Sequence, residues 1–149
     1  MHGHAYALSP LIGLALMAVI CGGAIWKGGI EERATAIALL LAWAGTLMLR
    51  DPRWIGPQWG AFMTDGLLLV FLLAQALWSP KYWPIFAAGF HLLAVITHAA
   101  RIIDVGLGAW AYATAALIWA YLVLGSLAVG TWNVWRRRQR LDLGARPAS

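Results

Sequence analysis

The residues of this sequence that could do chemistry are few, and four of them stand in two neighbouring apolar segments. Asp65 is in one segment, and His91, His98 and Arg101 are in the next. His91 and His98 are seven residues apart, which on a helix is two turns along one face and a rise of about 10 Å. Titratable imidazole and carboxyl groups inside a membrane are what a proton or ion path uses, and imidazole is also an axial ligand of haem.

Asp65 is expected to face His98 and Arg101. It lies six residues past Trp59, and His98 lies six residues before Asp104 on the following segment, so in a hairpin both lie about 9 Å below the outer boundary. An ionisable group at the centre of a membrane helix costs roughly 2.5 to 3.5 kcal/mol, so each one needs a partner or a purpose. We predict one polar intramembrane cluster, made of Asp65, His91, His98, Arg101 and Asp104.

Several roles are compatible with this cluster. It could form a proton or ion path, ligate haem b, or bind a quinone or a lipid headgroup through His98 or Arg101. Haem b meets the difficulty that both histidines stand on one helix, too far apart for one iron. The cluster could equally be a satisfied network that fixes the helix register. We find no catalytic triad pattern, HExxH motif or phosphate-binding glycine loop, which disfavours an enzyme, and we predict no metal site.

The elements that must position these residues are membrane spans. Of the 149 residues, 62% are hydrophobic and only 11% are charged, whereas ordinary soluble domains are about 45–50% apolar and about 25% charged. Too little polar surface remains to cover a globule in water. The composition therefore excludes a soluble enzyme, a disordered tail and a water-soluble nucleic-acid-binding domain.

Charges, prolines and glycines divide the chain into five apolar segments, each compared with the ~20 residues that a helix needs to cross the hydrocarbon. The predicted spans are about 8–26, 34–49, 60–78, 82–103 and 109–132, in a single domain over 1–135, followed by a basic cytoplasmic tail at 136–149. The segment 34–49 is short because we expect Glu31, Glu32 and Arg33 to form a charged turn. The predicted fold class is all-α, a polytopic transmembrane helix bundle of about five spans.

Basic residues and tryptophans predict the orientation of this bundle. With five spans and the basic tail inside, eight basic residues lie inside and three outside, which places the N-terminus outside and the C-terminus in the cytoplasm. The residues expected at lipid headgroups are Arg136, Arg137, Arg138 and Arg140. Indole rings prefer the membrane interface. The expected interfacial anchors are Trp26, Trp54, Trp59, Trp78, Trp83, Trp110, Trp132 and Trp135.

The pattern favours a small multi-pass protein of a bacterial inner membrane. We expect it to act as an accessory or structural subunit of a larger membrane complex, or as a self-associating bundle. Its expected partners are the lipid bilayer and other membrane subunits or a second copy, and not nucleic acid. The alternative is a small transporter, channel or electron-transfer protein, with a quinone or haem b bound at Asp65, His91, His98 and Arg101.

Overall fold

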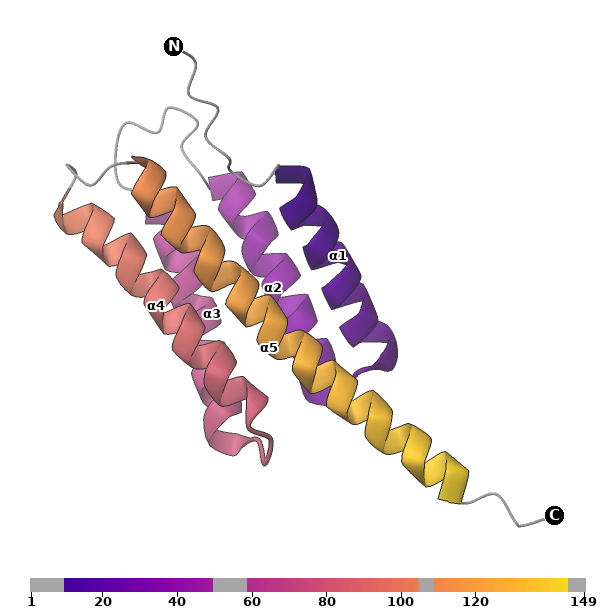
Figure 1. The fold of residues 1–149 in the computed structure, drawn as a ribbon. Coiled ribbons are helices and arrows are strands. Elements are labelled where there is room, and N and C mark those ends of the chain that lie inside the picture. Colours follow the sequence, from indigo (N-terminus) through magenta and orange to yellow (C-terminus); the bar gives the residue numbers. More distant parts are fainter. Residues whose placement is uncertain (1–9, 50–58, 105–108, 145–149) are drawn as a thin grey trace.

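The protein is a bundle of five α-helices (Figure 1). The computed structural model describes residues 10–49, 59–104 and 109–144. The helices in these ranges are α1 (Pro10–Lys27), α2 (Ile30–Leu49), α3 (Trp59–Trp78), α4 (Trp83–Ile103) and α5 (Ala109–Gly144). By length and composition, α2 to α5 can each cross a membrane, and α1 is a shorter apolar helix. The predicted all-α membrane bundle is confirmed.

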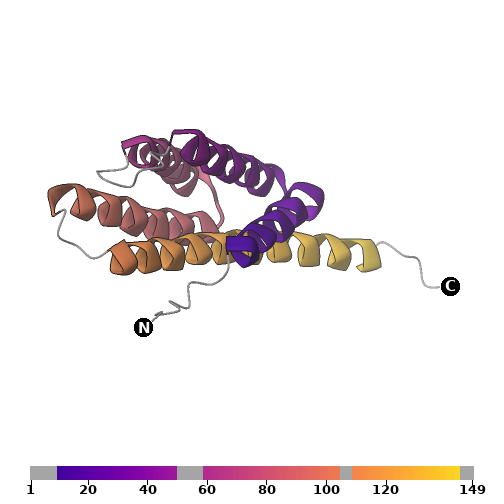
Figure 2. The same cartoon turned by 90° about the horizontal axis from the view of Figure 1, so that it is seen from above.

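Consecutive helices run antiparallel, so the bundle has two ends (Figure 1). Following the predicted orientation, we call the end with the turns 28–29 and 79–82 the inner end. The outer end holds the start of α3 and the end of α4. Helix α5 packs against α4 and also against α1, and it thereby closes the bundle (Figure 2).

Helix α5 is longer than the bundle. Its 36 residues correspond to about 54 Å at 1.5 Å per residue, against about 30 Å of hydrocarbon. Its last turns project past the inner end (Figure 1), so the segment predicted as a basic tail continues the helix as far as Gly144. The guanidinium of Arg138 donates to the carbonyl oxygens of Lys27 and Gly28 at 3.3 and 3.5 Å. These bonds tie α5 to the end of α1.

The core of the bundle is a thin apolar layer. Its buried members are Cys21, Ala24, Ala36, Leu68, Leu72, Trp83, Ala87, Ala88, Val123, Leu124 and Leu127. Large apolar side chains cover the outside instead, and Leu67 and Leu77 are 74% and 80% exposed. In water such a surface would drive aggregation, whereas in lipid it is the expected solvent-facing surface.

The start of α2 differs from the prediction. Glu31, Glu32 and Arg33 do not form a turn but belong to the first turns of α2. Carboxylates are favoured there by the positive end of the helix dipole. In addition, the backbone N–H of Gly29 donates to Glu32 Oε2 at 2.9 Å, which caps the helix end. The helix therefore has 20 residues and not sixteen.

Candidate functional site

Two polar clusters lie between the helices, one near each end. The inner cluster consists of Glu31 and Glu32 on α2, Gln75 on α3, Ser79 and Lys81 in the α3–α4 turn, and Trp83 on α4. The outer cluster consists of Asp65 on α3, His91 and His98 on α4, and Tyr112 on α5. Each cluster joins three helices.

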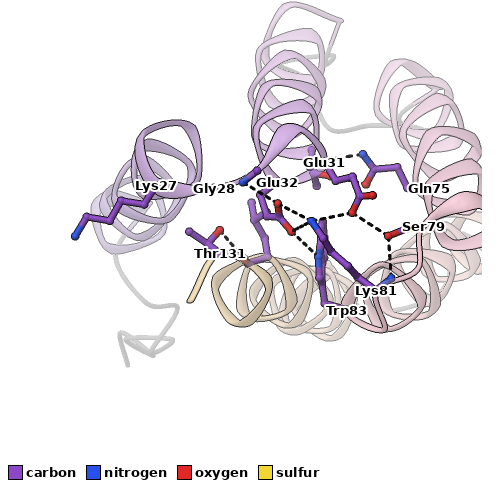
Figure 3. Close-up of polar contacts among 12 residues, drawn as sticks. Lys27, Gly28, Glu31, Glu32, Gln75, Ser79, Lys81, Trp83 and Thr131 are labelled. Carbon is purple, nitrogen blue, oxygen red and sulfur yellow. Dashed lines mark hydrogen bonds and ion pairs between the residues drawn. The ribbon is translucent and has the colours of Figure 1, made fainter. Parts of the chain in front are cut away.

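The carboxylate of Glu32 is the centre of the inner cluster (Figure 3), and its side chain is fully buried. Its Oε1 accepts hydrogen bonds from Lys81 Nζ and from Trp83 Nε1, both at 2.8 Å. Its Oε2 accepts from Lys81 Nζ at 3.1 Å and from the Gly29 N–H at 2.9 Å. A carboxylate removed from water needs this degree of satisfaction, because an unpaired buried charge costs several kcal/mol.

Lys81 also holds the second carboxylate of the inner cluster. Its Nζ lies 3.0 Å from Glu31 Oε2, and the same oxygen accepts a hydrogen bond from Ser79 Oγ at 2.8 Å. Gln75 Nε2 donates to the Glu31 carbonyl at 3.3 Å, while Gln75 Oε1 accepts from Thr35 Oγ1 at 2.7 Å. Through these bonds α2 is fastened to α3 along about one helical turn.

Lys81 of the inner cluster remains charged at neutral pH. Burial by itself lowers the pKa of Lys81, but hydrogen bonds to Glu32 and Glu31 and their negative charges outweigh burial, so this pKa is raised above its ordinary value of 10.5. The two carboxylates exceed the one ammonium by one negative charge, and the positive end of the α2 dipole lies beside them. Chemically, the arrangement is an ion-pair clasp whose donors and acceptors are largely occupied by one another.

Sequence reasoning missed the inner cluster. Glu31 and Glu32 belong to the predicted turn between the first two spans, and Lys81 lies between the third and fourth predicted spans. Both turns fall at the same end of a five-span bundle, which is the one signal that could have suggested a contact. Trp83 needs a correction, since we expected it to anchor the bundle at the membrane interface. Its ring is buried and points inward, because the indole N–H donates to Glu32.

The outer cluster is a hydrogen-bonded chain across three helices. Asp65 Oδ2 lies 2.7 Å from His98 Nε2, and His98 Nδ1 lies 2.6 Å from the Tyr112 hydroxyl. His91 Nε2 lies 3.0 Å from the carbonyl oxygen of Asp65 and 4.0 Å from its Oδ1. The structure thus brings Asp65 and His98 together as their depths predict. Tyr112 was missed, because an uncharged residue near a helix start carries no signal in the sequence.

The other predicted members of the cluster lie farther toward the outer end. Arg101 is partly buried in the last turn of α4. Asp104 follows the last residue of α4, and its backbone N–H donates to the Ala100 carbonyl at 2.9 Å. Its side chain is exposed, so Asp104 belongs to the end of the bundle and not to its interior.

His98 does not suit an axial ligand of haem b in this arrangement. An axial ligand needs a free imidazole nitrogen, whereas both ring nitrogens of His98 and Nε2 of His91 already contact Asp65 or Tyr112. Within residues 10–49, 59–104 and 109–144, no group of three His, Cys, Asp or Glu side chains could hold a metal ion.

The remaining predicted anchors lie at both ends of the bundle. Trp26 and Trp78 are 79% and 83% exposed at the inner end, as an interfacial ring should be. Trp132 and Trp59 are about half exposed, at the inner and outer ends respectively. Trp135 is partly covered, and its ring lies tilted against that of Trp132 with a centroid distance of 4.8 Å. Trp54 and the side chain of Trp110 lie outside the described residues.

Comparison with known proteins gives no relative for this chain. No family model, no curated protein and no solved structure matches it. The fold and the two clusters define the class, a small polytopic membrane protein with polar clasps between its helices.

Proposed function

We propose that the protein is a structural or accessory subunit of a larger assembly in a bacterial inner membrane, or a bundle that associates with copies of itself. One observation carries this proposal. The polar groups of both clusters are engaged with one another, and the helices that contribute to both clusters carry no polar side chain between them. On α3 this apolar stretch runs from Gly66 to Ala74, and on α4 it runs from Pro84 to Phe90.

The apolar stretch between the two clusters has a functional consequence. Asp65 and Gln75 are ten residues apart on α3, or about 15 Å along the axis. A proton or ion crossing the bundle needs polar groups or water within hydrogen-bond reach of one another. Leu68 and Leu72 fill the core between these two residues. Two separate clasps suit a protein that must hold its shape against neighbours better than one that must conduct.

Mild solubilisation followed by native mass measurement and identification of co-purifying proteins tests the proposal. The expected result is one defined mass well above the 16.2 kDa of one chain, composed of fixed partners or of several copies. The variant D65N should lower the yield of this complex, while D142N, the same change at an exposed position, should not. A monomer without partners would refute the proposal.

The proposed orientation can be tested separately. The inner end carries Lys27, Arg33 and Lys81 as well as the arginines of α5, which supports a cytoplasmic inner end. A green fluorescent protein fused to the C-terminus should fluoresce if that terminus lies in the cytoplasm. The same protein does not become fluorescent when bacteria export it across the inner membrane as an unfolded chain. An alkaline phosphatase fusion at the same position should be inactive. The opposite pair of results would show that the orientation in the membrane is the reverse of the one proposed.

A second candidate function rests on the outer cluster alone. The chain Asp65, His98 and Tyr112 has the donors and acceptors to exchange a proton with a ligand or with a neighbouring subunit at the outer end. If this is its use, Y112F and H98Q should abolish a transport or redox activity measured in vesicles while the native mass stays unchanged. Loss of assembly in the same variants would favour the structural role.

A further inference from the structure

A groove lies between the inner halves of α4 and α5, beside the inner cluster, whose Lys81 and Trp83 form part of its wall. Helix α5 diverges from α4 toward the α3–α4 turn (Figure 1), and the groove between them has a volume of about 620 Å³. Phe86 and Phe90 line it on α4, and Tyr121, Leu122 and Val129 line it on α5. Its walls are therefore mostly apolar and aromatic, which suits a hydrocarbon chain.

The groove has the length of one membrane leaflet. The residues of α5 that line it run from Tyr121 to Arg137, which are separated by sixteen positions or about 24 Å at 1.5 Å per residue. Half of a bilayer, including its headgroups, measures about 20–22 Å. One end of the groove thus lies at the headgroups of the inner leaflet and the other near the middle of the membrane.

The mouth of the groove carries one cation, Arg137, that the inner cluster does not hold. Two cations line it, but the ammonium of Lys81 is neutralised by Glu31 and Glu32. Arg137 has no hydrogen bond or ion pair with any of the residues that the structure describes, and it is exposed. Asn133 lies one turn before it on the same face of α5 and lines the groove as well. A guanidinium and an amide at this depth are suited to a phosphate group.

We propose that this groove binds one anionic phospholipid of the inner leaflet, which goes beyond the structural role proposed above. An acyl chain lies along Phe86, Phe90 and Leu122, and the phosphate pairs with Arg137. The charge of the mouth favours an acidic lipid over a zwitterionic one, and the arginines farther along α5 raise the local concentration of acidic lipids. A neutral quinone would leave Arg137 without a counterion.

Two glycines in the helices allow a matched test of acyl-chain binding in the apolar part of the groove. A Cβ built on Gly125, which lines the groove, meets no atom within 4 Å, and the same holds for Gly89 on α4, which does not line it. G125L should therefore fill the groove without displacing the protein's own side chains, and G89L adds the same side chain elsewhere. For the mouth, R137Q has a matched control in R136Q, which removes the neighbouring charge outside the groove.

Native mass spectrometry of the purified protein is the experiment, with phosphatidylglycerol or phosphatidylcholine of equal chain length added. The wild type should bind the first phosphatidylglycerol about tenfold more tightly than phosphatidylcholine, equivalent to about 1.4 kcal/mol. R137Q should remove this preference and R136Q should retain it. G125L should weaken binding of both lipids severalfold relative to G89L, and thermal unfolding establishes that both variants are folded.

Several outcomes would overturn the proposal. Equal loss of the preference for phosphatidylglycerol in R137Q and R136Q would mean that basic residues attract acidic lipids diffusely, without a specific phosphate-binding site at Arg137. Equal lipid binding by G125L and G89L, or no lipid adduct on the wild type, would exclude the groove. Displacement of phosphatidylglycerol by decylubiquinone in R137Q as readily as in the wild type would assign the groove to a quinone. Should G125L fail to fold, the comparison of R137Q with R136Q still decides, because both positions are exposed.

Discussion

Replacement of Lys81 by methionine perturbs the inner cluster most directly. Methionine has a similar length and no charge, so K81M removes the cation that lies 2.8 Å from Glu32 Oε1 and 3.0 Å from Glu31 Oε2. Glu32 would keep its hydrogen bonds from Trp83 and Gly29. It would nevertheless be a fully buried carboxylate that has lost its cation.

The loss of stability expected for K81M follows from this geometry. Removing one partner of a buried ion pair costs about 3–5 kcal/mol. Glu32 can limit this cost by taking up a proton, which at pH 7 requires about 3.7 kcal/mol, because the reference value for glutamate lies about 2.7 units lower and each unit is about 1.36 kcal/mol. The Lys81 side chain is also 33% exposed, so water moderates the effect. We expect K81M to lower the free energy of unfolding by about 2–4 kcal/mol.

The assay is unfolding in mild detergent by SDS titration, followed by tryptophan fluorescence. The matched control is K27M at the same end of the bundle, since Lys27 Nζ lies over the rings of Trp26 and Trp135 at 5.5 and 4.9 Å and should contribute less than about 1 kcal/mol. The double variant E32Q/K81M should lose less stability than the two single variants added together, because E32Q removes the unpaired charge. If K81M behaves like K27M, or if the two losses simply add, the inner cluster is not an ion-pair clasp.

The pH dependence of this effect gives a second check. The pKa of Lys81 is raised above 10.5, so the stability that its charge supplies is fully present below pH 10.5 and is lost as the pH rises through the raised value. On the acid side, protonation of Glu32 at pH 5 costs only about 1 kcal/mol. The difference between wild type and K81M should therefore shrink toward pH 5, and a difference that is unchanged from pH 5 to pH 8 would contradict the reasoning.

Two further predictions concern the packing of α4 against α5 and the outer cluster. G130A should lower stability by about 1–3 kcal/mol, because a Cβ there would lie 2.7 Å from the Trp83 ring. G89A, which meets nothing within 4 Å, should be neutral or stabilise by up to about 1 kcal/mol, and equal melting temperatures of the two variants would speak against the close approach. H98A should cost about 1–3 kcal/mol because it deprives Asp65 of its 2.7 Å partner. Y112F should cost about 1 kcal/mol, and melting of both variants at the wild-type temperature would remove the case for a clasp at the outer end.

The outer cluster could be predicted in part because it depends on a local hairpin. A turn of four residues, 79–82, joins α3 to α4, and a short turn forces antiparallel packing in a fixed register. The depths of Asp65 and His98 then follow from the rise per residue alone. Tyr112 lies on the next helix, and the sequence does not fix the register of that helix against α4. Sequence reasoning therefore missed Tyr112.

The inner cluster could not be predicted for the corresponding reason. Glu32 and Lys81 are 49 residues apart, on elements that meet only because α2 packs against α3 and α5 closes the bundle around them. The sequence marked both residues as belonging to one end of the membrane, but many charged pairs share an end without touching. The inward turn of Trp83 depends on this same contact.

The sequence by itself determined that this protein lies in a membrane, that it is all-α, and approximately where most of its helices end; the start of α2 and the end of α5 are the exceptions. These properties depend on residue types within one segment and on the constant geometry of a helix. Only the tertiary structure decided which faces meet, which carboxylate Lys81 neutralises, and where a groove stays open between α4 and α5. In lipid, apolar faces are nearly equivalent to one another, so packing and hydrogen bonds between distant segments make that choice.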